Sequence, residues 1–309
     1  MDIYFAPIQG HTDAPYRHFH ADTYGQPSGY FTPFIRLEHD KLRPRDIKDF
    51  TSELNDGMQV VPQIIFRDEN ELTRLIALMK ENGATRINLN MGCPFPLQTG
   101  HGRGAATVAN ESLAAAVENA VNANPDIEFS LKMRLGMTDP EEWHTLLPHL
   151  NNAKLNHICV HPRVARQQYG GDLYLDQFGK ILAESSNPVV FNGEIKTPAD
   201  IASIKERFPE ISGVMLARGI LGRPSLAAEY LSGEEWPKEK RIETMIKFHR
   251  CLLDYYSSVL CGDSQLVAKI KPFWEYAEDE IGHKAWKAIK KATNMAKYHS
   301  AVAMVGDNL

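Results

Sequence analysis

The sequence predicts an α/β protein, a (β/α)8 TIM barrel followed by a small C-terminal helical domain. Short apolar, β-branched or aromatic runs recur eight times, and most intervals between them show helical periodicity. These β-type runs cease after Leu231. The length of 309 residues suits a barrel of roughly 250 residues with a compact appendage.

The eight runs have the composition of buried strands. They are IYFAPI from Ile3, YFTPFIR from Tyr30, VVPQIIF from Val60, RINLNM from Arg86, FSLKMR from Phe129, HICVHPR from His157, PVVFNG from Pro188 and VMLAR from Val214. Strands that alternate with helices indicate a parallel sheet, and eight such units favour a closed barrel over an open doubly wound sheet.

Helices are expected between the runs. Residues 68–82 begin with acidic residues at the positive end of the helix dipole and stop at Gly83. Residues 111–122 and 198–208 show the same kind of pattern. Beyond Leu231 the chain is predicted to form several helices.

Gly233 and Pro237 supply the expected boundary between a barrel domain, residues 1–232, and a helical domain, residues 233–309.

The composition, 43% hydrophobic and 24% charged, is that of a globular protein. The acidic second residue and the short apolar start fit neither a signal peptide nor a membrane span, so we expect a cytoplasmic protein without a membrane partner. The four cysteines form no C-x-x-C pair, so no metal site is expected. A net charge of −5 excludes a strongly basic nucleic-acid binder, and a polyanion would need a local patch.

Polar residues end every predicted strand, and in a TIM barrel this end carries the active site. They are Gln9, Arg36, Gln63, Asn90, Cys93, Lys132, Arg134, His161, Arg163, Asn192, Glu194 and Arg218. A single polar group at a strand end often only caps the barrel rim. Eight strands that all end this way favour a functional site.

Gly193 and Gly219 follow the last two strands, where backbone amides can approach a phosphate, and Arg218 can add charge-assisted hydrogen bonds. Ordinary turns are the alternative explanation of these glycines. Lys132 lies inside an apolar run, and a buried cation needs an anionic or electron-rich partner. His161 is either a donor to a ligand carbonyl or a satisfied core residue.

Cys93 lies in the segment NMGCPFP, where Gly92 and Pro94 bend the chain after the fourth strand and expose the sulfur at the barrel mouth. A thiol with a pKa near 8.5 is mostly protonated at neutral pH and can serve as a proton donor. Cys159, within an apolar run, is expected to be a core residue.

The chain resembles the bacterial type of the tRNA-dihydrouridine synthase family. The resemblance lies in APIQGHTD, NMGCP, KMRLG, VHPR with QQYGG, NGEI, ARGILGRP and, in the tail, AKIKPFW. It implies an FMN-binding catalytic barrel, NADPH or NADH as reductant, and reduction of the C5–C6 double bond of specific uridines in tRNA. A hydride from reduced flavin would reach C6, and Cys93, the family's catalytic acid, would protonate C5.

The resemblance also implies residue roles. Cofactor contacts fall on Pro7, Ile8, Gln9, Gln63, Lys132, His161, Asn192, Gly193, Glu194, Ala217 and Arg218. Contacts to the flipped uridine and its RNA are expected from Arg36, Asn90, Arg163, Tyr169, Lys269 and Lys271.

The helical segment would bind tRNA. Lys284, Lys287 and Lys291 share one helix face by their spacing and with Lys269 and Lys271 would form a stripe for phosphates. A solvated helix face is the alternative. The protein is expected to be a monomer.

Three positions depart from the family pattern: Pro162 in VHPR, Ala217 in the phosphate motif, and the segment after Cys93, which lacks the usual lysine. Two other functions are weighed against this one. They are an FMN barrel that reduces a free pyrimidine, like a dihydroorotate dehydrogenase, and a catalytically silent tRNA-binding barrel. The basic residues of the tail disfavour the first, and the presence of Cys93, Lys132 and His161 disfavours the second.

Overall fold

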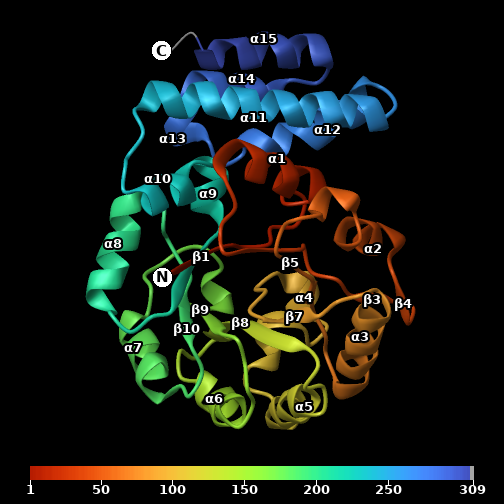
Figure 1. Cartoon of the computed structure of the whole chain (residues 1–309), viewed down its shortest axis with the longest axis vertical. Helices are drawn as coiled ribbons and strands as arrows, with labels where there is room; N and C mark the ends of the chain where they lie inside the picture. Colours follow the sequence, from red (N-terminus) through yellow and green to blue (C-terminus); the bar gives the residue numbers. More distant parts are fainter. Residues whose placement is uncertain (307–309) are drawn as a thin grey trace.

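The computed structural model describes residues 1–306 and confirms a barrel of parallel strands surrounded by helices (Figure 1). The strand order is β5-β2-β1-β11-β10-β9-β8-β7-β6. The strands are β1 (Asp2–Phe5), β2 (Gly29–Phe31), β5 (Val60–Val61), β6 (Gln63–Ile64), β7 (Arg86–Met91), β8 (Glu128–Gly136), β9 (Ile158–Val164), β10 (Val189–Phe191) and β11 (Gly213–Leu216).

The predicted run from Val60 forms two strands because Pro62 interrupts it. Proline has no N–H to donate to a neighbouring strand. β5 pairs with β2, whereas β6 pairs with β7, and the Pro62 carbonyl accepts a hydrogen bond from the Asn88 amide at 2.9 Å. The strand order therefore begins and ends in one short segment of chain. Eight predicted runs give nine strands in a nearly closed barrel.

Helices lie around the barrel and at its mouth. They are α1 (Ala14–Tyr24), α2 (Pro44–Phe50), α3 (Glu69–Glu81), α4 (Pro96–Thr99), α5 (Glu111–Asn122), α6 (Trp143–Asn151), α7 (Leu175–Glu184), α8 (Pro198–Arg207), α9 (Arg218–Gly222) and α10 (Leu226–Ser232). The three helices predicted from their patterns are confirmed, α3 being one residue shorter than expected at each end and α8 one residue shorter at its C-terminal end. Asp68 caps α3 by accepting a hydrogen bond from the Glu71 amide at 2.8 Å, and Gly83 follows with φ +82°.

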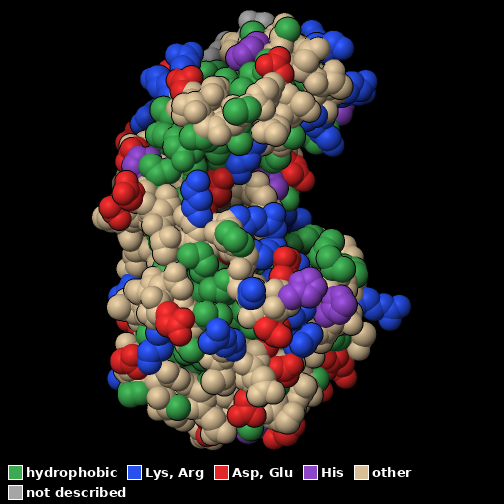
Figure 2. Space-filling view, turned by 90° about the vertical axis from the view of Figure 1, so that its right-hand side faces the viewer, with side chains coloured by type: hydrophobic (Ala, Val, Ile, Leu, Met, Phe, Trp, Pro, Cys, Tyr) green, Lys and Arg blue, Asp and Glu red, His purple; other side chains and the backbone are tan. Residues whose placement is uncertain are grey.

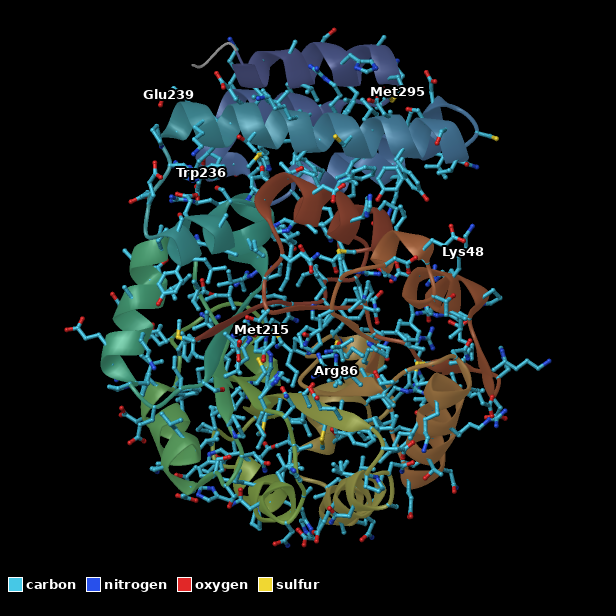
Figure 3. All side chains as sticks on the ribbon, viewed as in Figure 1. Lys48, Arg86, Met215, Trp236, Glu239 and Met295 are labelled. Atoms are coloured by element: carbon cyan, nitrogen blue, oxygen red, sulfur yellow. The ribbon has the colours of Figure 1, made fainter. Side chains whose placement is uncertain are left out.

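Alternation along the strands divides the barrel core into two parts. Tyr4, Cys159, Val190 and Met215 belong to a small cluster inside the barrel, with Met215 near its centre (Figure 3). Their neighbours along the strands belong to a larger cluster shared with the helices and the C-terminal region. Cys159 is fully buried, as predicted for a core cysteine.

Helices α11 to α15 gather at one end of the molecule, above α1 (Figure 1). They are α11 (Lys238–Val259), α12 (Asp263–Ile270), α13 (Glu278–Ile281), α14 (His283–Lys291) and α15 (Met295–Gly306). Phe248 of α11 packs edge-on against Tyr16 of α1, with ring centroids 5.0 Å apart. Buried aromatic contacts thus join the helical region to the barrel.

The predicted boundary residues lie between α10 and α11. Gly233 ends α10 with φ +71°, and Pro237 precedes α11. The division into two domains stays a prediction, and residues 307–309 of the second predicted domain lie outside the described part of the chain.

The remaining elements are short. They are β3 (Leu37–Glu38), β4 (Lys41–Leu42), η1 (Glu53–Asn55), η2 (Gly104–Thr107), η3 (Ala165–Gln167) and η4 (Lys271–Trp274). Within residues 1–306, every helix is too short or too polar to span a bilayer.

Candidate active site at the barrel mouth

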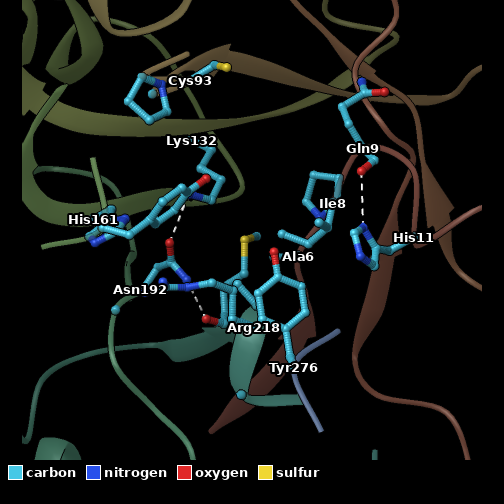
Figure 4. Close-up of a pocket in the computed structure, with 18 of the residues that line it drawn as sticks. Ala6, Ile8, Gln9, His11, Cys93, Lys132, His161, Asn192, Arg218 and Tyr276 are labelled. Atoms are coloured by element: carbon cyan, nitrogen blue, oxygen red, sulfur yellow. Dashed lines mark hydrogen bonds between the residues drawn. The ribbon is translucent and has the colours of Figure 1, made fainter. Parts of the chain in front are cut away.

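A cavity of about 1030 Å³ opens where the strands end (Figure 4). Its walls contain most of the residues that the sequence predicts for the site. These are Pro7, Ile8, Gln9, Arg36, Gln63, Asn90, Cys93, Lys132, His161, Tyr169, Asn192, Gly193, Glu194, Ala217 and Arg218. Fifteen side chains or backbone segments, spread over 212 positions of sequence, thus come together around one space.

Strand alternation explains why polar groups enter the cavity. Leu131 and Met133 of β8 pack outward in the large core cluster, so Lys132 between them points into the barrel. The same alternation turns Asn90 of β7 and His161 of β9 inward. The sequence rule that placed functional groups at strand ends therefore has a simple geometric basis.

A chain of hydrogen-bonded amides on β6 and β7 leads to Cys93. The Gln63 side chain donates to Asn88 Oδ1 at 2.7 Å and accepts from Asn90 Nδ2 at 2.8 Å. Asn90 Oδ1 then accepts from the backbone amides of Gly92 at 3.1 Å and Cys93 at 2.9 Å. Asn90 therefore fixes the turn that carries the cysteine, in addition to its predicted role with the substrate.

The loop after Cys93 folds back onto it. The Ala105 amide donates to the Cys93 carbonyl at 3.1 Å. Gly104, with φ +61°, lies so close that an added Cβ would be 2.5 Å from the same oxygen. Arg103 forms a buried ion pair with Glu71 of α3. These contacts hold Cys93 in place without the lysine that is usual in this loop.

The Cys93 thiol is half-buried in the cavity wall. Burial raises the pKa of Cys93, while a hydrogen bond from the Phe95 backbone and the charges of Lys132 and Arg134 lower it by less. The thiol is consequently protonated at neutral pH. It is suited to donate a proton rather than to attack as a thiolate.

Several basic side chains line the cavity wall near Cys93, and few acidic side chains lie close enough to balance their charge. Burial lowers the pKa of Lys132, whose ammonium donates to Asn192 Oδ1 at 2.9 Å. Burial lowers the pKa of Arg134 to about 10. Burial and then the charges of Arg134 and Lys132 lower the pKa of His161 well below its ordinary value, so its imidazole is neutral. Such an arrangement fits an electron-rich or anionic ligand.

Glu194 and Arg218 line the side of the cavity after β10 and β11, and Arg163 lies behind them. Glu194 Oε1 accepts from Arg163 at 2.6 Å and from Arg218 at 2.8 Å. Burial raises the pKa of Glu194, but the Arg163 hydrogen bond and the Arg218 charge outweigh it and lower the pKa overall. Glu194 has φ +49°, a strained conformation for a residue with a side chain.

Gly193 precedes Glu194 with φ +147°, and Gly219 lies so close to the Ile195 carbonyl that an added Cβ would be 1.8 Å from it. The loops after β10 and β11 therefore approach this closely only because position 219 is glycine, whereas Gly193 supplies a backbone conformation that other residues rarely adopt.

Three of the predicted residues lie outside the cavity wall. Arg163 is buried behind it, where Glu194 and the Gly171 carbonyl hold its guanidinium. Lys269 pairs at 2.5 Å with Asp13, the N-cap residue of α1. Lys271 donates to the backbone carbonyls of Lys290 at 2.8 Å and Ala292 at 3.1 Å. The two lysines thus have partners within the protein, and their predicted contact with RNA stays a prediction.

The cavity also contains residues outside the predicted set of ligand contacts. Arg134 follows Lys132 by two residues and shares its face, a signal that the sequence already contains. Tyr276 comes from the helical region, and only tertiary packing brings it to the mouth. Gln98 is buried, and its Oε1 has no hydrogen-bond partner within residues 1–306. An unpartnered buried oxygen in a cavity wall indicates a site for a donor from a ligand.

Basic and acidic residues line different sides of the cavity opening. Arg36, Arg43 and Arg45 line one side, and Asp279 and Glu280 of α13 line another. Figure 2 shows a notch between the helical end and the barrel in which Lys and Arg side chains gather beside Asp and Glu. Among residues 1–306, no group of three or more His, Cys, Asp or Glu side chains is arranged to hold a metal ion.

Comparison with known proteins places this geometry in context. Residues 4–304 match the family model described as dihydrouridine synthase (Dus). A probable tRNA-dihydrouridine synthase 2 of Bacillus subtilis is 28% identical over 82% of this chain and 78% of its own length. The tRNA-dihydrouridine(16) synthase of Cupriavidus necator is 28% identical over 99% of this chain and 94% of its own.

A solved structure of morphinone reductase superposes with a TM-score of 0.54 over 76% of this chain and 86% of its own, at 10% identity. At that identity the similarity supports the barrel fold alone.

Proposed function

The chain belongs to the dihydrouridine synthase family, and from this premise we propose how its barrel mouth carries out the reaction. The protein is a tRNA-dihydrouridine synthase, a flavin-dependent oxidoreductase that reduces uridines in tRNA with FMN as cofactor and NADPH as reductant. The observation that carries the proposed mechanism is the position of the Cys93 thiol, whose pKa burial raises, in the same cavity wall as Lys132.

The residues present fit FMN. Its isoalloxazine carries carbonyl oxygens, which Lys132 and Arg134 suit as buried donors, and an N3–H donor, which the unpartnered Gln98 oxygen suits. Gln63 and His161 offer further hydrogen-bonding groups, and Pro7, Ile8 and Gln9 form the facing wall.

For the phosphate end we propose the loops after β10 and β11. Arg218 is partly exposed and supplies a cation, and the close approach at Gly219 brings backbone from both loops together. Asn192, Gly193, Glu194 and Ala217 complete this part of the wall. When bound there, reduced FMN supplies the hydride that C6 of uracil receives.

Cys93 supplies the proton in this proposal. As C6 gains a hydride, negative charge builds toward C5 and O4 of the uracil, and transfer of the Sγ proton to C5 neutralises it. The Phe95 amide and the charges of Lys132 and Arg134 then stabilise the resulting thiolate. A proton from solvent restores the thiol, so the balance is one hydride and one proton added across C5–C6.

The target uridine must leave its base stack to reach Cys93. We assign Arg36, Asn90, Arg163 and Tyr169 to holding it and its flanking phosphates. Tyr169 is 52% exposed, and the Arg218 guanidinium lies 4.4 Å from its ring centroid, which stiffens a platform at the rim.

The helical region, from residue 233 onward, is proposed to bind the body of the tRNA. Lys284, Lys287 and Lys291 of α14 are exposed, as a phosphate-binding face requires. Lys269 and Lys271 are proposed to add to this surface from α12 and η4. We further propose that the protein works as a cytoplasmic monomer.

The test is to map dihydrouridine in tRNA from cells with and without this gene, by reverse transcription and mass spectrometry. One or more uridines should lose the modification in the deletion strain and regain it when the gene is returned. Purified protein with FMN and NADPH should modify the same positions in transcripts. A deletion strain with every dihydrouridine intact, together with reduction of free uracil or orotate without RNA, would exclude the proposed function.

A further inference from the structure

Phe95 is exposed, whereas the other phenylalanines of the chain are buried or partly buried. Of thirteen, it is the one in the exposed class, with 59% of its surface accessible. Leu97, two residues on, is also 59% exposed. Both line the cavity beside Cys93. Exposed apolar side chains that share the rim of one cavity are candidates for contact with a partner.

The backbone keeps these side chains on the surface. Pro96 begins α4, and the amides of Gln98 and Thr99 donate to the Phe95 carbonyl at 2.8 and 3.1 Å. Gly100 then donates to the Pro96 carbonyl at 2.8 Å. This single turn directs Gln98 into the wall and leaves Phe95 and Leu97 outside the hydrophobic core. Within residues 1–306 no aromatic ring stacks on Phe95.

The charges of the rim indicate the kind of partner. Arg36, Arg43 and Arg45 line the same cavity as Phe95. Arg36 pairs with Glu38 and Arg43 with Asp46, whereas the Arg45 side chain is 74% exposed and lies 3.7 Å from its nearest carboxylate oxygen. Apolar surface next to cations suits a chain of aromatic rings joined by phosphates. The acidic side at Asp279 repels such a chain, so the phosphates are drawn to the arginines.

We propose that Phe95 and Leu97 form an apolar step on which the base next to the target uridine stacks after the uridine has left the stack. This inference rests on the proposed function and names how the site holds its RNA. Removing one base exposes the ring faces of its neighbours, and an aromatic side chain at the entrance replaces the lost contact. Only Pro94 separates Phe95 from the proton donor, which places the step beside the reacting base.

The test compares Phe95→Ser and Leu97→Ser with the control Leu231→Ser, which removes a similarly exposed leucine, 57% accessible, from α10 outside the cavity. In the FMN- and NADPH-loaded enzyme, we expect Phe95→Ser to raise KM for tRNA about tenfold, with kcat changed less than twofold. Leu97→Ser should raise KM about threefold. Phe95→Trp should restore the wild-type KM, which loss of folding cannot explain.

A tRNA with 2-aminopurine beside the mapped uridine gives a second measurement. Its fluorescence should be quenched on binding the wild-type enzyme and Phe95→Trp, and should stay high with Phe95→Ser. If wild-type enzyme reduces tRNA but Phe95→Ser matches Leu231→Ser in KM and quenching, the stacking step is excluded and the proposed function stands. If wild-type enzyme reduces no uridine in tRNA, the proposed function itself fails.

Discussion

The barrel mouth and the junction between α1 and the helical region use charged residues in opposite ways. At the mouth, Arg134 is buried and Lys132 partly buried with few acids near them, and desolvation lowers the pKa of each. At the junction, Asp13 caps α1, accepts from Tyr256 at 2.8 Å and pairs with Lys269 at 2.5 Å. For these residues, the cations left unbalanced indicate a ligand, and the charges balanced within the protein indicate a structural contact.

The largest effect on activity is expected from substitution of the proton donor at the barrel mouth. Cys93→Ala should lower the rate of uridine reduction about 1,000-fold, because general acid catalysis contributes roughly 10²–10⁴-fold. FMN should still bind, and NADPH should still reduce it. Single-turnover reduction of tRNA and flavin absorbance measure the two steps separately. Cys251→Ala, which changes an exposed cysteine of α11, is the matched control.

The same residue sets a pH dependence. Because burial raises the pKa of Cys93, its proton is present throughout the neutral range and is lost only as pH rises above the raised value. Uridine reduction should therefore hold its rate up to about pH 8.5, the ordinary pKa of a thiol, and decline beyond it. A rate that falls between pH 6 and 8 would contradict a protonated thiol as the acid.

Lys132→Met should separate function from stability at the mouth. Removing the ammonium should reduce flavin-dependent turnover about 100-fold, since a buried charge near a developing anion has an effect of this order. The FMN-free protein should unfold at a higher temperature, because a buried and poorly paired cation is costly. Lys154→Met changes an exposed lysine and should alter neither quantity. A lower unfolding temperature for Lys132→Met would show that the lysine is structural.

The sequence predicts the mouth better than the junction. Alternation along a strand is local, so Lys132 and His161 could be assigned to the cavity from strand ends alone. The pairing of Lys269 with Asp13 joins positions far apart in the chain, and no local pattern signals it. Tyr276 likewise reaches the cavity through tertiary packing that no local pattern signals. The break at Pro62 could be predicted only in part. Its missing N–H is evident from the sequence, but the division into β5 and β6 depends on which strands lie on either side.

The smallest effects are expected on tRNA binding, and they test whether unpaired and internally paired lysines also differ in their contacts with RNA. Lys287→Met should weaken tRNA binding about threefold and reduce the slope of log K against log salt by roughly 0.7–0.9, as loss of one phosphate contact does. Lys269→Met should change the slope less, because Asp13 competes for the ammonium. It should instead lower the thermal unfolding temperature, whereas Lys287→Met should not.

Fluorescence titrations of tRNA at several salt concentrations, with thermal unfolding of the same samples, decide between the two roles. Equal slope changes would mean that Lys269 leaves Asp13 to meet a phosphate. The junction would then belong to the RNA-binding surface, and internal pairing would no longer distinguish structural charges from functional ones.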